Sequence, residues 1–175
     1  MKKFIILIVL SIFSLAVFSV QAGSPLDNYT TDDWSVTSEE ARKENLPIMI
    51  VFSADDCSYC EHLKEEILNP GVLSGTLDKR VLVREFNIDV GGKITDFDGE
   101  RIRARMFVNR YKVFATPTVV FVDADGETIT PPIVGYNNPD DYRERLHKAL
   151  NSAQLHTASL LENLLAAQSS SRFPD

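Results

Sequence analysis

Cysteine is scarce in this chain of 175 residues, which contains only Cys57 and Cys60. A small secreted protein held together by structural disulfides normally carries more cysteines, at wider spacing. A bridge across the two intervening residues would close almost no loop, so it would add little stability through chain entropy. The pair is therefore better explained by its chemistry than by a structural role.

Basic residues are also in the minority: 18 Lys and Arg face 25 Asp and Glu, for a net charge of −7. Such an acidic chain argues against binding to nucleic acid or to an anionic membrane surface. Histidine is rare too, and His62, His147 and His156 lack the clustered spacing of a zinc site. Glu61, not histidine, follows the second cysteine, which excludes c-type haem attachment. No cofactor or metal is expected, and a metal-delivery module is a minor alternative.

The N-terminus has the order of an export signal. Met1-Lys2-Lys3 is followed by the uncharged, mostly apolar stretch 4–20 and then by Gln21-Ala22. This order is typical of a secretory signal peptide, residues 1–22, cleaved after Ala22. The stretch is as long as the shortest membrane spans, so an uncleaved anchor in the membrane is the alternative. Cleavage would leave 16 Lys and Arg against 25 Asp and Glu, a net charge of −9. In both cases the folded part is predicted to lie in the periplasm.

The two cysteines stand between a strand pattern and a helix pattern. The β-branched run 48–52 predicts a buried strand, and a short polar turn leads from it to Cys57. After Cys60, apolar residues recur at helical spacing up to 69–71, where Asn-Pro-Gly is expected to end the helix. Cys57 should therefore lie at a helix N-terminus, where unpaired amides and the helix dipole favour a thiolate. We expect Cys57 to attack a substrate disulfide and Cys60 to resolve the mixed disulfide.

The rest of the chain alternates between helix and strand patterns. A polar surface segment, 23–36, is expected to pack Trp34 on the domain. The other expected elements are a helix at 37–45 that begins with a capping box, a strand at 81–89, a polar loop at 91–99 with a tight turn at 96–99, a helix at 101–112, a strand at 119–122, a hairpin turn at 123–126, an edge strand at 128–134, and a helix from 139 to at least 150. This order predicts an α/β fold in which helices flank a sheet.

The predicted domain spans residues 23–150, and residues 151–175 are predicted to form a C-terminal helical extension and tail. The extension, 153–167, is rich in Leu and Ala. Packing on the domain's own surface is the favoured interpretation, and docking to a partner or to a second copy is the alternative. Residues 169–175 are predicted to be a disordered tail.

Three motifs follow one another in an order that resembles the thioredoxin superfamily. They are the cysteine motif at 57–60, Phe-Asn-Ile-Asp at 86–89, and Thr116-Pro117-Thr118 before an apolar strand. The resemblance covers residues 36–150 and is greatest to exported thioredoxin-like proteins of the SoxW type. It implies the thioredoxin fold, with a central mixed sheet flanked by helices. It also implies a cis bond at Thr116-Pro117 that faces the cysteines, and a substrate strand paired with the Thr116 backbone. Tyr59, between the cysteines, either touches a partner or is an exposed loop aromatic.

The sequence departs from thioredoxin around the cysteines. Asp56 replaces a tryptophan, and Val51 replaces the buried aspartate that serves in proton transfer. Glu85 matches a strand lysine, so it is a candidate proton acceptor beside Cys60, although an exposed or ion-paired glutamate is the favoured interpretation. Asp55 and Asp56 disfavour a neighbouring thiolate, while Asp56 is also expected to cap the helix.

These features together predict a periplasmic thiol–disulfide oxidoreductase. The resemblance favours a reductase of protein or small-sulfur disulfides, which a thiol electron donor would regenerate. A Dsb-type oxidase or isomerase is the first alternative, and a redox-inactive thioredoxin-fold binding module is the second. Contact with a membrane is expected only if the N-terminal segment remains uncleaved.

Overall fold

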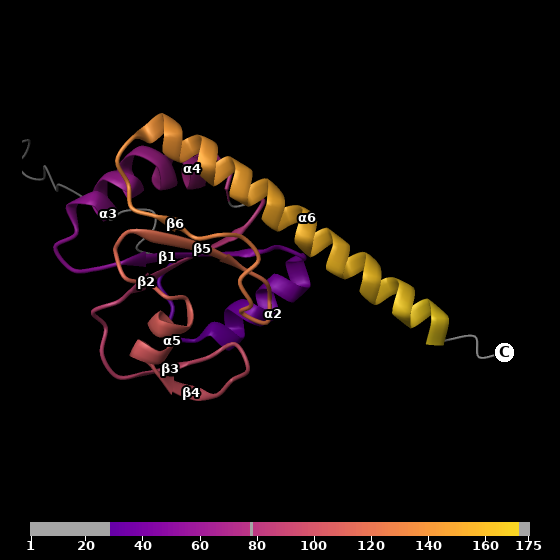
Figure 1. Cartoon of the computed structure of the whole chain (residues 1–175). Helices are drawn as coiled ribbons and strands as arrows, with labels where there is room; N and C mark the ends of the chain where they lie inside the picture. The colour runs from indigo at the N-terminus through magenta and orange to yellow at the C-terminus, as the bar shows by residue number, and fades with distance from the viewer. Residues whose placement is uncertain (1–28, 78, 172–175) are drawn as a thin grey trace, which may run out of the picture.

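The structure is a computed structural model that describes residues 29–77 and 79–171. A four-stranded sheet in the order β2-β1-β5-β6 forms its centre. The strands are β1 (Ile48–Ser53), β2 (Leu82–Asn87), β5 (Thr118–Val122) and β6 (Ile133–Val134). β1 runs parallel to β2 and antiparallel to β5, and β5 runs antiparallel to β6. The sheet is therefore mixed, as predicted, and helices surround it (Figure 1).

β1 divides the hydrophobic core into two halves. Met49 and Val51 face one half, and Ile48, Ile50 and Phe52 face the other. The first half is covered by α3 (Ser58–Leu63), η2 (Lys64–Leu68), α4 (Asn69–Leu73) and α6 (Pro139–Ser171). The second half is covered by α2 (Trp34–Glu44) and α5 (Ala104–Arg110). A strand buried on both faces needs apolar residues at every position, which is why this stretch shows no alternation.

α2 begins earlier than the capping box at 37–40 indicates. The helix starts at Trp34, and the carboxylate of Asp33 caps it by accepting hydrogen bonds from the backbone N–H groups of Ser35 and Val36. The hydrogen bond from the Ser35 hydroxyl, helped by these backbone bonds, lowers the pKa of Asp33. Part of the segment predicted to lie on the surface is therefore helical. Asp33 is a weak cap signal in the sequence, because it precedes a tryptophan rather than a run of helix formers.

Trp34 packs on the domain, as predicted, and is fully buried. Its ring lies 4.6 Å from that of Phe107, 5.5 Å from that of Phe97 and 6.2 Å from that of Phe86, measured between centroids. These four rings come from α2, α5, β2 and the turn at residues 96–99. The aromatic cluster therefore ties the N-terminal helix to elements far away in sequence.

The helix that follows the cysteines does not end at residues 69–71, contrary to the prediction. It continues through the π-helical segment η2 into α4, and the Asn69 N–H donates to the Lys64 carbonyl five residues back. Pro70 then occupies the first turn of α4, where a missing N–H is tolerated. A π-helical turn shifts the hydrogen-bond register. The apolar spacing alone could not reveal that shift.

The predicted helix 101–112 is wrong in its first part. Residues 101–103 form β4 (Arg101–Arg103), which pairs antiparallel with β3 (Lys93–Thr95), and α5 begins only at Ala104. The tight turn predicted between them is confirmed, because the Gly99 N–H donates to the Asp96 carbonyl at 3.0 Å. Three-residue strands are too short for their alternation to stand out against a neighbouring helical pattern.

The turn of this hairpin is held to α5 by an ion pair. Asp96 is 4% exposed, and its carboxylate accepts hydrogen bonds from both terminal nitrogens of Arg110. Burial alone would raise the pKa of Asp96, but the bonds from Arg110 and from the Phe97 N–H outweigh it and lower the pKa. Because the folded pKa lies below the unfolded one, the stability from this pair is present above the unfolded pKa. It is lost as the pH falls through the folded pKa.

We therefore expect Asp96→Asn to lower the free energy of unfolding at neutral pH by about 1–3 kcal/mol, since Arg110 loses its charged partner. Urea unfolding measured over a range of pH checks this. The gap between the variant and the wild type should close as the pH falls below 3.8, the ordinary pKa of the carboxyl. A gap that persists at lower pH would show that packing, not ionisation, accounts for the loss.

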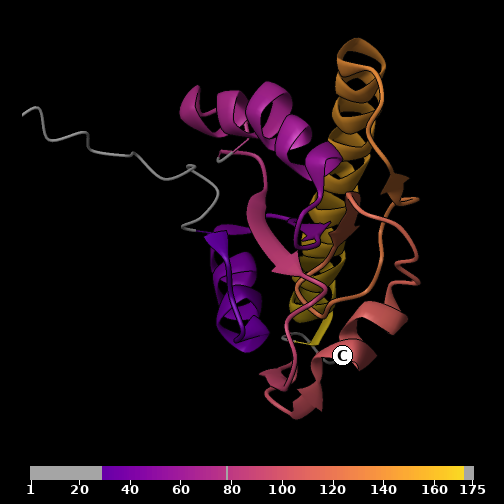
Figure 2. The same cartoon turned by 90° about the vertical axis from the view of Figure 1, so that its left-hand side faces the viewer.

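The C-terminal part contains one short edge strand and one long helix. Of the predicted strand 128–134, only β6 forms a ladder, with a single bridge between Val122 and Thr128. α6 starts at Pro139, and the Asn138 side chain caps it as predicted. The helix runs unbroken to Ser171, so residues 169–171 belong to it rather than to a tail. It extends beyond the sheet (Figures 1 and 2).

The predicted signal peptide, 1–22, lies outside the described residues, as do residues 172–175. Within the part of the chain that the structure does describe, no helix combines the length and the apolar character needed to cross a membrane.

Candidate active site

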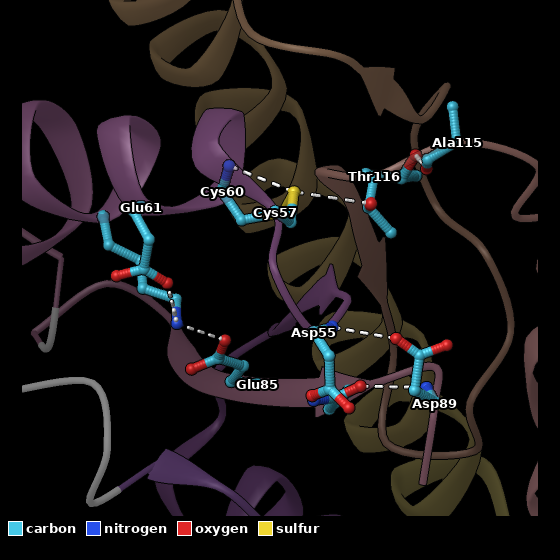
Figure 3. Close-up of a disulfide and its surroundings, with 11 residues drawn as sticks. Asp55, Cys57, Cys60, Glu61, Glu85, Asp89, Ala115 and Thr116 are labelled. Carbon is cyan, nitrogen blue, oxygen red and sulfur yellow. Dashed lines mark hydrogen bonds and ion pairs between the residues drawn. A yellow bond between two sulfur atoms is a disulfide. The ribbon is translucent and has the colours of Figure 1, made fainter.

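Cys57 and Cys60 form a disulfide at the N-terminus of α3 (Figure 3). Cys57 is the N-cap residue, and its Sγ accepts a hydrogen bond from the Cys60 N–H at 3.2 Å. The predicted position of the pair is thus confirmed, with Cys60 inside the first turn. The prediction that Asp56 caps the helix is wrong, because the sulfur of Cys57 occupies that role. Asp56 instead has φ 52°, in the left-handed region.

The two cysteines differ in their access to solvent. Cys60 is 2% exposed, whereas Cys57 is only partly buried. Cys57 is therefore the cysteine on the solvent side of the pair. Cys57 is also the cysteine at the helix start, where free backbone amides stabilise a negatively charged sulfur.

Thr116 lies opposite the cysteines, on the loop that leads into β5. Its hydroxyl is 3.5 Å from Cys57 Sγ and is oriented to donate a hydrogen bond to it (Figure 3). The peptide bond between Thr116 and Pro117 is cis. The structure therefore brings the Thr116-Pro117 pair and the cysteine pair together across 59 residues of sequence.

A polar network holds the turn between β1 and α3 to the end of β2. The Asp55 N–H donates to Asp89 at 2.8 Å, and the Asn87 amide donates to the Asp55 carboxylate at 2.7 Å. Asn87 also accepts a hydrogen bond from the Asp89 N–H at 2.8 Å, which closes the network. Two carboxylates are thereby fixed at the turn that leads from β1 towards Cys57. The sequence shows that residues 86–89 belong to the motif, but it does not reveal their link to Asp55.

Glu85 is buried and paired with Lys64. The Lys64 Nζ lies 2.7 Å from Glu85 and 3.2 Å from Glu61. Burial would lower the pKa of Lys64, but its bonds and charge interactions with Glu85 and Glu61 reverse this and raise it. Glu85 is thus the ion-paired strand glutamate of the favoured interpretation. It lies next to Val51 in the paired strands.

No motif in the sequence marks Lys64 as part of the site. Its backbone N–H bonds to the Cys60 carbonyl, so it lies one turn beyond the second cysteine. Its place four residues after Cys60 is the only signal that could have indicated it, because residues four apart share one face of a helix.

A hollow of about 480 Å³ lies beside the cysteines. Tyr59 and Thr116 line one part of it, and Tyr136, Asp141 and Arg145 are among the residues lining the rest. Tyr59 is 60% exposed, so its ring is free to meet another molecule. Tyr59 and Thr116, both predicted as contact residues, therefore share one hollow, whereas Glu85 does not line it.

A mixed sheet with flanking helices, a cysteine pair at a helix start and an opposing Thr-Pro loop define the class of thioredoxin-like thiol–disulfide oxidoreductases. The chain belongs to the thioredoxin-like domain family, whose model matches residues 35–150.

Individual relatives are more distant. The thiol:disulfide interchange protein DsbD of Ralstonia nicotianae is 24% identical over 108 residues, which make up 62% of this chain and 16% of that protein. The chain thus spans about a sixth of the length of this curated relative. Among solved structures, a thioredoxin from Thermus thermophilus is similar with a TM-score of 0.50 and 20% identity, over 68% of this chain and 84% of that one. The C-terminal domain of Neisseria meningitidis DsbD, in the oxidised form, has a TM-score of 0.49 and 17% identity, over 66% of this chain and 90% of that one.

Proposed function

We propose that the chain is a periplasmic thiol–disulfide oxidoreductase that reduces disulfides of proteins or of small sulfur compounds. The observation that carries this proposal is the unequal cysteine pair: an accessible Cys57 at a helix start, bonded to a covered Cys60. The name of the Ralstonia relative, a thiol:disulfide interchange protein, supports the same chemistry. The predicted signal peptide at 1–22 supports export.

In the proposed cycle, the Cys57 thiolate attacks one sulfur of a substrate disulfide. That S–S bond breaks, a mixed disulfide forms, and the first substrate sulfur leaves as a thiolate that takes up a proton. Cys60 then loses its proton and attacks Cys57 Sγ, so the second substrate thiol is released and the Cys57–Cys60 disulfide returns. Two electrons have passed to the substrate. A dithiol donor restores the reduced pair by the reverse exchange.

The residues around Cys57 support this cycle in different ways. The Cys60 N–H and the Thr116 hydroxyl both point at Cys57 Sγ and stabilise negative charge on it. In the proposal, the backbone of Thr116-Pro117 pairs with an extended substrate segment, and Tyr59 contacts the residues next to the substrate cysteine.

Glu85 remains a proposed proton acceptor for Cys60, acting from within its pair with Lys64. If it acts so, Glu85→Gln should slow the resolution of a mixed disulfide with a changed pH profile, and Glu85→Asp should restore part of the rate. Stopped-flow measurement of mixed-disulfide decay checks this. An unchanged pH profile in Glu85→Gln would leave Glu85 with its ion-pair role alone.

The acidic surroundings favour a reductase over a Dsb-type oxidase. A strongly oxidising pair depends on a stabilised reduced form, in which the attacking cysteine is a thiolate. Here Asp56, the residue before Cys57, and Asp55, whose N–H donates to Asp89, place negative charge on the turn that leads to that thiolate and work against it. A redox titration in thiol buffers decides the direction. A potential near roughly −270 mV indicates a reductant, and one near roughly −120 mV indicates an oxidant.

Asp56→Asn should make the pair more oxidising, because it removes the charge adjacent to Cys57 while asparagine still tolerates the left-handed backbone. An exposed charge interaction of ~0.5–1 kcal/mol corresponds to a rise of roughly 10–20 mV in potential. The same variant should react faster with iodoacetamide at neutral pH once reduced. Asp98→Asn, in the turn between β3 and β4, is the control and should change neither quantity. A lower potential in Asp56→Asn would contradict the electrostatic explanation.

A further inference from the structure

The second half of α6 has a different composition from the first half. Residues 139–148 include six charged side chains, whereas residues 149–171 include one, Glu162. The first half lies along the domain, and the second half projects past it (Figure 1). A helix surrounded by water normally carries its charged residues on its exposed faces. This helix loses its charge at the point where its exposure increases.

The row that packs α6 on the sheet continues along the projecting half, and all of its members except Thr157 are apolar. Its members, at alternating steps of three and four residues, are Leu146, Leu150, Ala153, Thr157, Leu160, Leu164 and Ala167. The first three are buried in the domain's own core. Leu160 and Leu164, with Leu161 and Leu165 beside them, form what we call the leucine face; in this order their exposed fractions are 40%, 61%, 37% and 57%. Steps that average 3.5 residues are the repeat of helices that pair along their length.

We infer that the leucine face is covered by the leucine face of a second copy of this chain. The full sequence carries a net charge of −7, so two copies repel each other over most of their surfaces. The projecting half is the part where this repulsion is smallest. Its single charge, Glu162, stands about 130° around the helix from the middle of the leucine face, so pairing two leucine faces does not bring the two Glu162 side chains together.

A lipid surface fits this segment poorly. Helices that lie in a membrane interface carry Lys or Arg on their polar face, and residues 149–171 contain neither. The pairing of two identical faces about a two-fold axis instead needs only a self-complementary surface. From Thr157 to Ser171 the helix is about 22 Å long, and this length is available for pairing with a second copy. In Figure 1 this end of α6 lies at the opposite side of the molecule from α3, so both cysteine sites remain open in the pair.

Sedimentation equilibrium of the purified protein tests this inference. We expect a mass twice that of one chain, falling towards one chain on dilution. The double variant Leu160→Glu/Leu164→Glu should have the mass of one chain at every concentration. Leu155→Glu is the matched control: Leu155 is 73% exposed on the other side of the same helix, so this variant should still pair.

Reduction of a disulfide substrate, measured on the same samples, shows that each variant is folded, and its rate per chain should be equal in all three. The inference is overturned if the wild type keeps the mass of one chain up to its solubility limit. It is also overturned if Leu155→Glu separates the pair as fully as the double variant does. The inference is also overturned if the wild type keeps the mass of one chain and sediments with phosphatidylcholine–phosphatidylglycerol vesicles, while the double variant does not. The leucine face would then bind a membrane rather than a second copy.

Discussion

Cys60→Ser should accumulate mixed disulfides with its substrates, and Cys57→Ser should accumulate almost none. In Cys60→Ser the accessible Cys57 still attacks, but no covered thiol remains to release the product. In Cys57→Ser the remaining thiol is 2% exposed, so a substrate sulfur cannot approach it in line. Turnover should fall by at least roughly 10³-fold in both variants, as when a catalytic nucleophile is removed.

Non-reducing electrophoresis of each variant, after reaction with a disulfide-bonded protein, separates these outcomes. Bands of higher mass that disappear on reduction should appear with Cys60→Ser only. Ser58→Ala is the matched control, because Ser58 lies within the motif and is exposed, yet carries no sulfur. Equal trapping by both cysteine variants would contradict the assignment of Cys57 as attacker and Cys60 as resolver.

Trp34→Ala should be the most destabilising single change outside the cysteine motif. The side chain is fully buried and contacts three phenylalanine rings, so its removal leaves a large cavity between α2, β2 and α5. Replacement of a buried aromatic by alanine costs about 3–5 kcal/mol. At roughly 2–4 °C per kcal/mol for a domain of this size, the melting temperature should fall by about 10 °C.

Urea and thermal unfolding measure this loss, and Val36→Ala is the control. Val36 lies on the same helix but is 59% exposed, so its truncation should change stability by less than about 0.5 kcal/mol. Trp34→Phe should cost less than Trp34→Ala, because the indole Nε1 is buried without a hydrogen-bond partner among the described residues. Equal losses in the alanine variants at 34 and 36 would show that helix propensity, not the aromatic cluster, sets the effect.

The features that the sequence could predict are those that depend on neighbouring residues along the chain. The run at 48–52, the polar turn and the helical spacing after Cys60 place the cysteine pair at a helix start, and the structure agrees. Distant contacts were predictable only through the resemblance. The cis bond at Thr116-Pro117 is present in the structure, yet nothing in those residues distinguishes them from the start of an ordinary strand.

The features that sequence could not predict depend on neighbours in space. Lys64 is one polar residue among several on a helix until β2 places Glu85 within 2.7 Å of it. Asn87 and Asp89 follow a strand, and only the parallel pairing of β1 with β2 shows that they hold Asp55. The helix passes Pro70 because a π-helical turn precedes it, and apolar periodicity carries no information about such a turn.

The position of β1 affects what kind of substrate can react. β1 pairs with a strand on each side and is covered on both faces, so its end, and the turn that presents Cys57, cannot shift without disturbing both halves of the core. The alignment of three sulfur atoms that exchange requires must then come from the substrate. Disulfides in flexible or partly unfolded segments can adapt at little energetic penalty, whereas those clamped inside a rigid domain cannot. If the chain reduces protein disulfides as proposed, we therefore expect it to react faster with disulfides in flexible segments than with those in rigid domains.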